Sequence, residues 1–295
     1  MMKVAIFGQF YNNTSGRSIK TLLNYLNTKN VEIEIEADFY NLVKSKNIIG
    51  TANFNFKTFT QLDSSHDLLF SIGGDGTILR ATTYVKDLEI PVVGINTGRL
   101  GFLATIQEDE VTSALNGIFN KEYTISERSL LAIKTSPETE ELINLNFALN
   151  EIAVSRKNTT SMITVETFLD GEYLTSYWAD GLIISTPTGS TGYSMSCNGP
   201  VITPGTGSFV LTPIAPHNLS ARPLVIPDST EITLKVSGRE DNFLVSLDSR
   251  IATLSNNTPI TIKKADFKIK LIELHSESFL KTLRKKLLWG EDRRN

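Results

Sequence analysis

The first 125 residues alternate short apolar runs with segments of helical periodicity. Residues 4–8 and 68–72 have the continuous apolar character of buried strands, and residues 31–36 alternate apolar and acidic positions. Apolar side chains recur at helical spacing over residues 19–26, and residues 91–96 form another apolar run. Strands that alternate with helices predict a parallel sheet with helices on both faces, which is an α/β domain.

From about residue 126 the pattern changes to short apolar segments separated by turn residues. The candidate strands are residues 130–134, 148–154, 162–169, 181–185, 208–212, 231–236, 243–247 and 260–264. Asp170-Gly171 stands between two alternating segments and predicts a tight hairpin. Many short strands with turn signals predict an all-β domain of the sandwich type.

The tail returns to helical spacing between residues 276 and 289, with Phe279, Leu283 and Leu287 on one face. An isolated terminal helix needs a docking surface to be stable, so we expect it to pack on the first domain. The sequence therefore predicts an N-terminal domain over residues 1–125, a β domain over 126–274 and a returning helix over 275–295.

Composition narrows the class of protein. The 295 residues carry 29 Lys and Arg against 32 Asp and Glu, a net charge of −3. A chain this near neutrality has no overall attraction for nucleic acid. No run approaches the roughly 18 apolar residues of a membrane span, and no secretory signal is evident. The lone cysteine, Cys197, excludes an internal disulfide. We expect a cytoplasmic protein with neither nucleic acid nor membrane as partner.

The sharpest local signal is Gly73-Gly-Asp-Gly-Thr77, which follows an apolar run and precedes a helix expected to extend to about Val85. Glycines let a backbone approach a ligand closely, and the N–H groups at a helix start suit phosphate. Asp75 is unusual there, because a carboxylate beside phosphates is unfavourable unless it binds a metal or accepts a proton. The alternative is an ordinary helix-entry turn in which Asp75 is a cap.

Further polar segments lie in the β part. Thr186-Pro-Thr-Gly-Ser-Thr-Gly-Tyr-Ser194 offers small hydroxyl side chains and glycines to a phosphorylated or ribose-containing ligand, although such a run is also typical of an ordinary loop. Asn150-Glu151 stands at a strand start, where it could bind ribose or adenine or be a solvated strand end. Asp180 could bind a ligand amide or cap a turn.

Together these segments resemble the bacterial NAD kinase family over about residues 67–248. The matching segments, in order, are Gly73-Gly-Asp-Gly-Thr77, Gly94-Ile-Asn96 with Leu100-Gly-Phe-Leu103, Asn150-Glu151, Asp180-Gly181 with the 186–194 block, and Pro216-His-Asn-Leu-Ser-Ala-Arg-Pro223. Gly-Gly-Asp-Gly alone also occurs in diacylglycerol kinases and phosphofructokinases. The combination with the 186–194 block does not.

The resemblance implies an N-terminal Rossmann-like α/β domain and a C-terminal β-sandwich domain, with the C-terminal helix returning to the first domain. It implies transfer of the terminal phosphoryl group of ATP to the adenosine-ribose 2′-hydroxyl of NAD, which gives NADP. The enzyme is then a phosphotransferase acting on an alcohol group, and some members also use inorganic polyphosphate. A divalent cation, usually Mg²⁺, is required, with no metal ligand assigned here. Members are usually homodimers or homotetramers.

The resemblance also implies roles for individual residues. Asp75 is the catalytic carboxylate that accepts or orients the 2′-hydroxyl proton, and Asp248 is a second carboxylate near that hydroxyl. The donor phosphates contact Gly73, Gly74, Gly76 and Thr77. The residues that bind NAD are Asp75, Gly76 and the phosphate-reaching Arg80; Asn150 and Glu151 at adenosine; Asp180 at the nicotinamide amide; and Thr191, Gly192, Tyr193, Ser194 and Ser196 along the pocket.

Three positions depart from the family pattern. Arg250 stands where Gln is common, Gly192 replaces a usual Ala, and Trp178 replaces an Arg at a position associated with preference for NAD over NADH. Two other functions are alternatives to NAD kinase: a lipid or sugar kinase that shares only Gly-Gly-Asp-Gly, and a dinucleotide-binding regulator without catalysis. Retention of both Asp75 and Asp248 argues against the regulator, and a turnover assay separates it from the enzyme.

Overall fold

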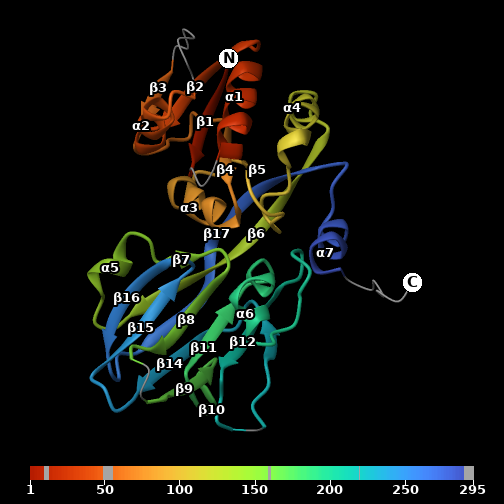
Figure 1. Ribbon diagram of the computed structural model, residues 1–295. Helices are drawn as coiled ribbons and strands as arrows, with labels where there is room; N and C mark the ends of the chain where they lie inside the picture. Colours follow the sequence, from red (N-terminus) through yellow and green to blue (C-terminus); the bar gives the residue numbers. More distant parts are fainter. Residues whose placement is uncertain (10–12, 49–55, 159–160, 219, 289–295) are drawn as a thin grey trace. The chain divides into compact units, whose positions relative to one another are not determined.

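The chain forms two compact units (Figure 1). The computed structural model describes residues 1–9, 13–48, 56–158, 161–218 and 220–288. The first unit comprises Met1–Glu127 together with Ile269–Asn295, and the second comprises Arg128–Lys268. Two long strands, β6 (Tyr123–Thr135) and β17 (Ile260–Leu274), run from one unit into the other.

The first unit is built on a parallel sheet, as the alternating pattern predicts. Its strands, apart from the ends of β6 and β17, are β1 (Met2–Gly8), β2 (Val31–Glu36), β3 (Lys57–Phe59), β4 (Leu68–Gly73) and β5 (Val92–Asn96). They lie in the order β3-β2-β1-β4-β5-β17, and their pairings are parallel. The order of β1 to β5 is that of a Rossmann-type sheet, in which it reverses between β1 and β4. The predicted α/β class is confirmed.

The helices of the first unit bury apolar side chains, apart from the short η1, in which no residue is buried. They are α1 (Asn13–Asn27), α2 (Ala37–Ser45), α3 (Asp75–Val85), η1 (Glu108–Glu110), α4 (Val111–Phe119) and α7 (Phe279–Leu287). Ile19, Leu22, Leu23 and Leu26 of α1 are each at most 1% exposed and share one core with β1, β4 and α4. The helical spacing of these four residues therefore marks the buried face of α1.

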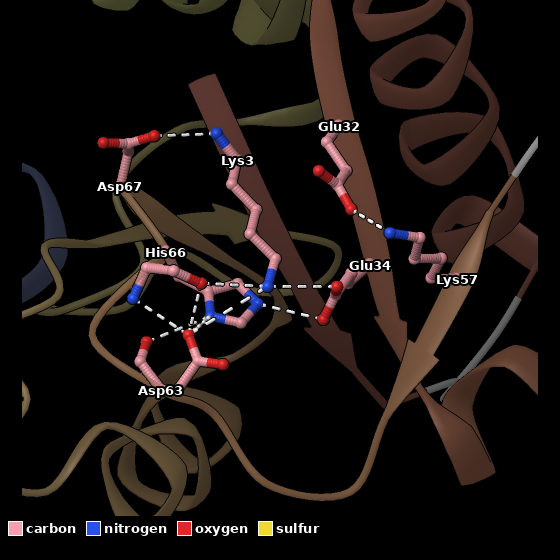
Figure 2. Close-up of polar contacts among 8 residues, drawn as sticks. Lys3, Glu32, Glu34, Lys57, Asp63, His66 and Asp67 are labelled. Atoms are coloured by element: carbon pink, nitrogen blue, oxygen red, sulfur yellow. Dashed lines mark hydrogen bonds and ion pairs between the residues drawn. The ribbon is translucent and has the colours of Figure 1, made fainter. Parts of the chain in front are cut away.

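A polar cluster joins β1, β2 and the segment that leads into β4 (Figure 2). The Lys3 Nζ lies 3.1 Å from Glu34 Oε1, and the Lys3 backbone N–H donates to Asp67. His66 is buried between Glu34 Oε2, 3.1 Å from Nε2, and Asp63, whose carboxylate lies 3.3 Å from Nδ1. Charged and polar side chains thus link β1, β2 and the segment before β4.

The second unit is a sandwich of two antiparallel sheets. Its helices and remaining strands are α5 (Glu140–Ile143), β7 (Phe147–Ala148), β8 (Glu151–Arg156), β9 (Ile163–Leu169), β10 (Glu172–Ala179), β11 (Gly181–Ser185), η2 (Gly189–Thr191), α6 (Tyr193–Ser196), β12 (Ser208–Ile214), β13 (Leu224–Pro227), β14 (Ile232–Ser237), β15 (Asn242–Leu247) and β16 (Arg250–Ser255). One sheet has the order β13-β12-β11-β8-β15-β16, and β10-β9-β14-β17 belong to the other.

Apolar side chains of both sheets share one core, which confirms the predicted sandwich. Val165 and Leu234 of one sheet, and Val154 and Phe243 of the other, are fully buried in this core. The predicted hairpin is also confirmed: Asp170 and Gly171 take positive φ values of 49° and 83° between the paired strands β9 and β10.

The single strand expected over residues 148–154 is wrong. The structure divides it into β7 and β8, with Leu149 and Asn150 between them in neither strand. The N–H groups of Leu149 and Asn150 donate to the Asp248 carboxylate instead of to a neighbouring strand. A side chain therefore replaces the ladder partner of this segment.

The C-terminal helix belongs to the first unit, as expected. Phe279 of α7 packs against Phe102 with ring centroids 6.1 Å apart, and Lys286 lies 4.9 Å from the Phe102 ring centroid. Two positions of the expected segments, Trp289 and Leu219, lie outside the described residues. Within the described ranges, no helix is both long and apolar enough to cross a membrane.

Candidate functional site

The glycine-rich turn lies at the carboxyl end of β4, where the strand order reverses. β4 ends at Gly73, Gly74 is the N-cap residue and Asp75 is the first residue of α3. In open α/β sheets, ligands bind at such a reversal point, outside the carboxyl ends of the strands. The turn therefore occupies the position where this fold binds ligands.

Asp75 anchors a loop rather than its own helix. Oδ2 accepts the Phe102 N–H at 2.8 Å, and Oδ1 accepts the N–H groups of Leu103 and Ala104 at 3.0 Å each. Gly101 makes this approach possible, because a Cβ there would lie 1.9 Å from Asp75 Oδ1. The alternative of Asp75 as a helix cap is wrong, since the cap is Gly74 and Asp75 binds residues 102–104.

The backbone beside Asp75 is open. A Cβ built on Gly74 or Gly76 would meet no atom within 4 Å among the described residues, and Gly76 is exposed. Thr77 is buried, with its hydroxyl 3.4 Å from Gln9 Oε1. Arg80 is exposed one turn further along α3, with its guanidinium carbon 5.9 Å from the Phe7 ring centroid. This end of α3 can therefore accept a phosphate without rearrangement of Gly74 or Gly76.

Asp248 makes the same pattern of hydrogen bonds in the second unit. Its Oδ1 accepts the N–H groups of Asn150 and Glu151 at 2.8 and 3.2 Å, and its Oδ2 accepts that of Leu149 at 3.0 Å. Asp248 lies in the two-residue turn between β15 and β16 with φ 53°, a conformation that Asp tolerates better than most residues. Burial raises the pKa of Asp248, and the three N–H bonds act in the opposite direction.

Asn150 and Glu151 lie against the 186–194 block. A Cβ on Gly189 would be 2.1 Å from the Asn150 carbonyl oxygen, so this close approach requires glycine. A Cβ on Gly192 would be 3.1 Å from Glu151 Oε2. The Tyr193 N–H donates to the Glu151 carboxyl group. The structure thus brings together the polar pair, the glycine-rich block and Asp248, which are far apart in the sequence.

Two buried polar atoms of this cluster make no hydrogen bond within the described part of the chain. Asn150 Oδ1 and Glu151 Oε2 are buried and have no hydrogen-bond partner among the described residues. Burial, with the charge of Asp248 as the second cause, raises the pKa of Glu151 to about 8. Glu151 therefore holds a proton at neutral pH and can donate a hydrogen bond as well as accept one.

Several hydroxyl groups of the block are used inside the unit. Thr186 Oγ1 donates to the Leu149 carbonyl at 2.6 Å, Ser190 Oγ donates to the Pro187 carbonyl at 2.7 Å, and Ser194 Oγ lies 2.8 Å from Thr212 Oγ1. All three residues are fully buried. Thr191 and Gly192 are partly exposed and Ser196 is exposed. The buried hydroxyl groups shape the block, and its accessible surface comes from the other positions.

Asp180 lies between β10 and β11, where its carboxylate pairs with Arg156 at 2.9 Å. Burial is the main cause of the raised pKa of Tyr193, and the charge of Asp180 is a smaller cause. Trp178 is 49% exposed, with its ring centroid 4.4 Å from that of His217. Trp178 and Tyr193 are both large aromatic side chains that the β unit leaves exposed.

Sequence reasoning missed the backbone partners of the two acids. The 100–103 segment was part of the family resemblance, yet nothing assigned its N–H groups to Asp75. Arg250 had no expected role, and the structure places its guanidinium on backbone carbonyls beside β7. A segment that follows a predicted strand and contains Gly101 was the available signal for the first of these contacts.

Comparison with known proteins identifies the family. The family model for the ATP-NAD kinase N-terminal domain matches residues 8–123, and that for the ATP-NAD kinase C-terminal domain matches residues 149–274. The chain belongs to the NAD kinase family. An NAD kinase of Flavobacterium psychrophilum is 60% identical over 295 residues and one of Cytophaga hutchinsonii is 46% identical over 295, each with both chains fully covered. The lipid or sugar kinase alternative is therefore wrong.

Two solved structures have the same fold. An NAD kinase from Archaeoglobus fulgidus in complex with ATP aligns with a TM-score of 0.71 and 26% identity, over 97% of each chain. A yeast NADH kinase complexed with NADH aligns with a TM-score of 0.86 and 23% identity, over 99% of this chain and 89% of the other. The two-unit architecture of this NAD kinase is thus shared with both.

Proposed function

We propose that this NAD kinase transfers the terminal phosphoryl group of ATP to the 2′-hydroxyl of the adenosine ribose of NAD, with Asp75 as the general base. The observation that carries the assignment is the anchored carboxylate at the ligand-binding end of β4. A carboxylate has about four acceptor positions, and three N–H groups use three of them. One position on Oδ2 is left for the ribose hydroxyl.

The residues around Asp75 supply positioning. Phosphoryl transfer depends mainly on alignment of the attacking oxygen and on neutralisation of phosphate charge. The N–H groups at the start of α3, near Gly74, Gly76 and Thr77, would hold the donor phosphates, and Arg80 would add a positive charge one turn away. Because residues 102–104 fix both oxygens of Asp75, the base is aligned before substrate binds.

The second unit would bind the dinucleotide. Asn150 Oδ1 and Glu151 Oε2, both buried without a partner among the described residues, support adenosine binding by this pair. Asp180 would hold the nicotinamide amide, and Thr191, Gly192, Tyr193, Ser194 and Ser196 would line the pocket. The buried Ser194 hydroxyl contacts Thr212, so its part in this lining would be to support the wall.

Asp248 was expected to be a second catalytic carboxylate near the reacting hydroxyl, and that role stays a prediction. Its contacts support a positioning role, because it holds the N–H groups of Leu149, Asn150 and Glu151. We propose that Asp248 keeps the adenosine-binding pair in place. Loss of Asp248 would then weaken NAD binding more than it slows the chemical step.

We propose a divalent cation, Mg²⁺, that arrives with ATP. Within the described ranges, no group of three His, Cys, Asp or Glu side chains could hold a metal ion. Mg²⁺ usually keeps several waters and binds largely through substrate phosphates, so the phosphates of ATP would be its main ligands. When bound, the cation neutralises charge on the transferred phosphoryl group. A homodimer or homotetramer and a cytoplasmic location stay predictions.

The proposal is tested by NADP formation from NAD, ATP and Mg²⁺ with purified protein. We expect turnover by the wild type, and polyphosphate in place of ATP shows whether a second donor is used. Binding of NAD without turnover with either donor would refute the kinase assignment and favour a dinucleotide-binding regulator.

A further inference from the structure

Residues 145–151 are held by the β15–β16 hairpin through backbone groups of both kinds. Asp248, the first residue of the two-residue turn, accepts the N–H groups of Leu149, Asn150 and Glu151. Arg250, at the start of β16, donates from Nη1 to the Leu145 carbonyl at 2.6 Å and from Nη2 to the Phe147 carbonyl. Three amides and two carbonyls of one segment are therefore fixed by two side chains of one hairpin.

The Arg250 guanidinium packs on an aromatic ring in addition to making these hydrogen bonds. Its guanidinium carbon lies 5.3 Å from the Phe147 ring centroid, and the Phe147 ring packs edge-on against Phe267 with centroids 5.2 Å apart. Phe147 is 3% exposed. The planar guanidinium donates to the two carbonyls from two separate nitrogens held in a rigid fork, whereas Lys and Gln each have a single terminal nitrogen. The two terminal nitrogens thus face backbone oxygens of the protein.

The segment of residues 145–151 includes Asn150 and Glu151, the pair proposed to bind adenosine. Asn150 lies in the break between β7 and β8, and Glu151 is the first residue of β8. On the other side, Thr186 Oγ1 donates to the Leu149 carbonyl and Thr186 N–H donates to the Asn150 carbonyl at 2.9 Å. The strand break that carries Asn150 is therefore fixed from two directions, and the hairpin supplies one of them.

We infer that Arg250 is a positioning residue for NAD binding, which acts by fixing the backbone of residues 145–147 and, through it, the orientation of Asn150 and Glu151. The inference rests on the proposed function of that pair. It distinguishes Arg250 from a direct ligand of NAD and from a residue that serves stability alone.

The test compares NAD affinity among variants by calorimetry, so that its readout does not depend on turnover. Arg250→Gln should raise the dissociation constant of NAD about tenfold, since two hydrogen bonds from a charged group are lost. Arg250→Lys, which retains the charge but not the fork, should show an intermediate rise. A matched control is Lys264→Gln, which removes an ion pair with Asp228 elsewhere in the β unit. It should leave NAD affinity unchanged.

A double-mutant cycle separates positioning from direct contact. If Arg250 acts through Asn150, the double variant Arg250→Gln/Asn150→Ala should raise the dissociation constant of NAD by less than the product of the two single-variant increases. Full multiplication would show an independent contact and would overturn the inference. A lowered melting temperature of both Arg250 variants with unchanged NAD affinity would also overturn it, because the role would be stability alone. Wild-type protein that binds NAD without turnover would refute only the proposed function.

Discussion

The two units each contain a carboxylate with the same hydrogen bonds and different surroundings. Asp75 and Asp248 both accept three successive backbone N–H groups, two on Oδ1 and one on Oδ2. Asp75 lies beside the open backbone of Gly74 and Gly76, at the end of a parallel strand. Asp248 lies in a hairpin turn and holds the segment of Asn150. The surroundings of an anchored carboxylate, and not its hydrogen bonds, therefore indicate its role.

The largest effect should follow from Asp75→Asn. The substitution removes the carboxylate that accepts the proton, and the new side-chain NH2 group would face the Phe102 N–H. We therefore expect kcat to fall about 10²–10⁴-fold. NADP formation at saturating NAD and ATP measures this loss, and the melting temperature reports whether the fold is kept. Retained activity with an unchanged melting temperature would exclude Asp75 as the base.

Asp248→Asn should affect binding more than chemistry. The amide leaves one of the three N–H groups of residues 149–151 unpaired and removes the charge that faces Arg250. We expect the dissociation constant of NAD to rise roughly tenfold while kcat at saturating NAD stays within about threefold. A fall in kcat as large as that of Asp75→Asn would restore the catalytic role expected from the sequence.

Glu151→Gln should change how stability depends on pH. The pKa of Glu151 is about 8 in the folded chain and near 4.5 when unfolded. Between these two pH values the folded chain binds the Glu151 proton and the unfolded chain does not. The stability that this protonation contributes is complete below pH 4.5 and is lost as the pH rises through 8. Gln does not titrate, so the variant should gain at least about 1 kcal/mol on the wild type between pH 5 and pH 8.5.

Urea unfolding at a series of pH values measures that difference. Glu172→Gln is a matched control on an exposed position of β10 and should show no comparable change. If the two variants track each other across this pH range, the burial of a protonated Glu151 would be contradicted.

The smallest effect concerns the redox state of the nicotinamide. Trp178 stands two positions before Asp180, and an aromatic face attracts the cationic ring of NAD more than the neutral ring of NADH. Trp178→Ala should therefore lower kcat/KM for NAD about threefold more than for NADH, and Trp178→Phe should retain most of the preference. An unchanged ratio in both variants would remove Trp178 from nucleotide selection.

Much of the fold follows from local pattern, because strands and turns have local signals. β2, the hairpin at Asp170-Gly171 and the end of β4 at the glycine-rich turn lie where the sequence places them. Helix α2 was missed because it follows β2 without a turn: Glu36 ends the strand and accepts the Phe39 N–H as a helix cap. The strand expected over residues 260–264 is longer in the structure, where β17 continues to Leu274.

The candidate site was predictable in its parts and not in its assembly. The motifs indicated Asp75, Asn150, Glu151 and the 186–194 block, each from local composition or from the family resemblance. The anchoring of Asp75 and Asp248 depends on which backbone N–H groups the fold brings near them. These contacts cannot be predicted from the spacing of residues in the sequence. The break between β7 and β8 was missed for the same reason.

The most direct test of the account is kcat at saturating NAD and ATP for the wild type, Asp75→Asn and Asp248→Asn, measured side by side. If only Asp75 is the base, Asp75→Asn loses turnover at every NAD concentration, whereas Asp248→Asn recovers turnover to within about threefold once NAD saturates. Equal losses in the two variants would contradict the division between a catalytic and a positioning acid.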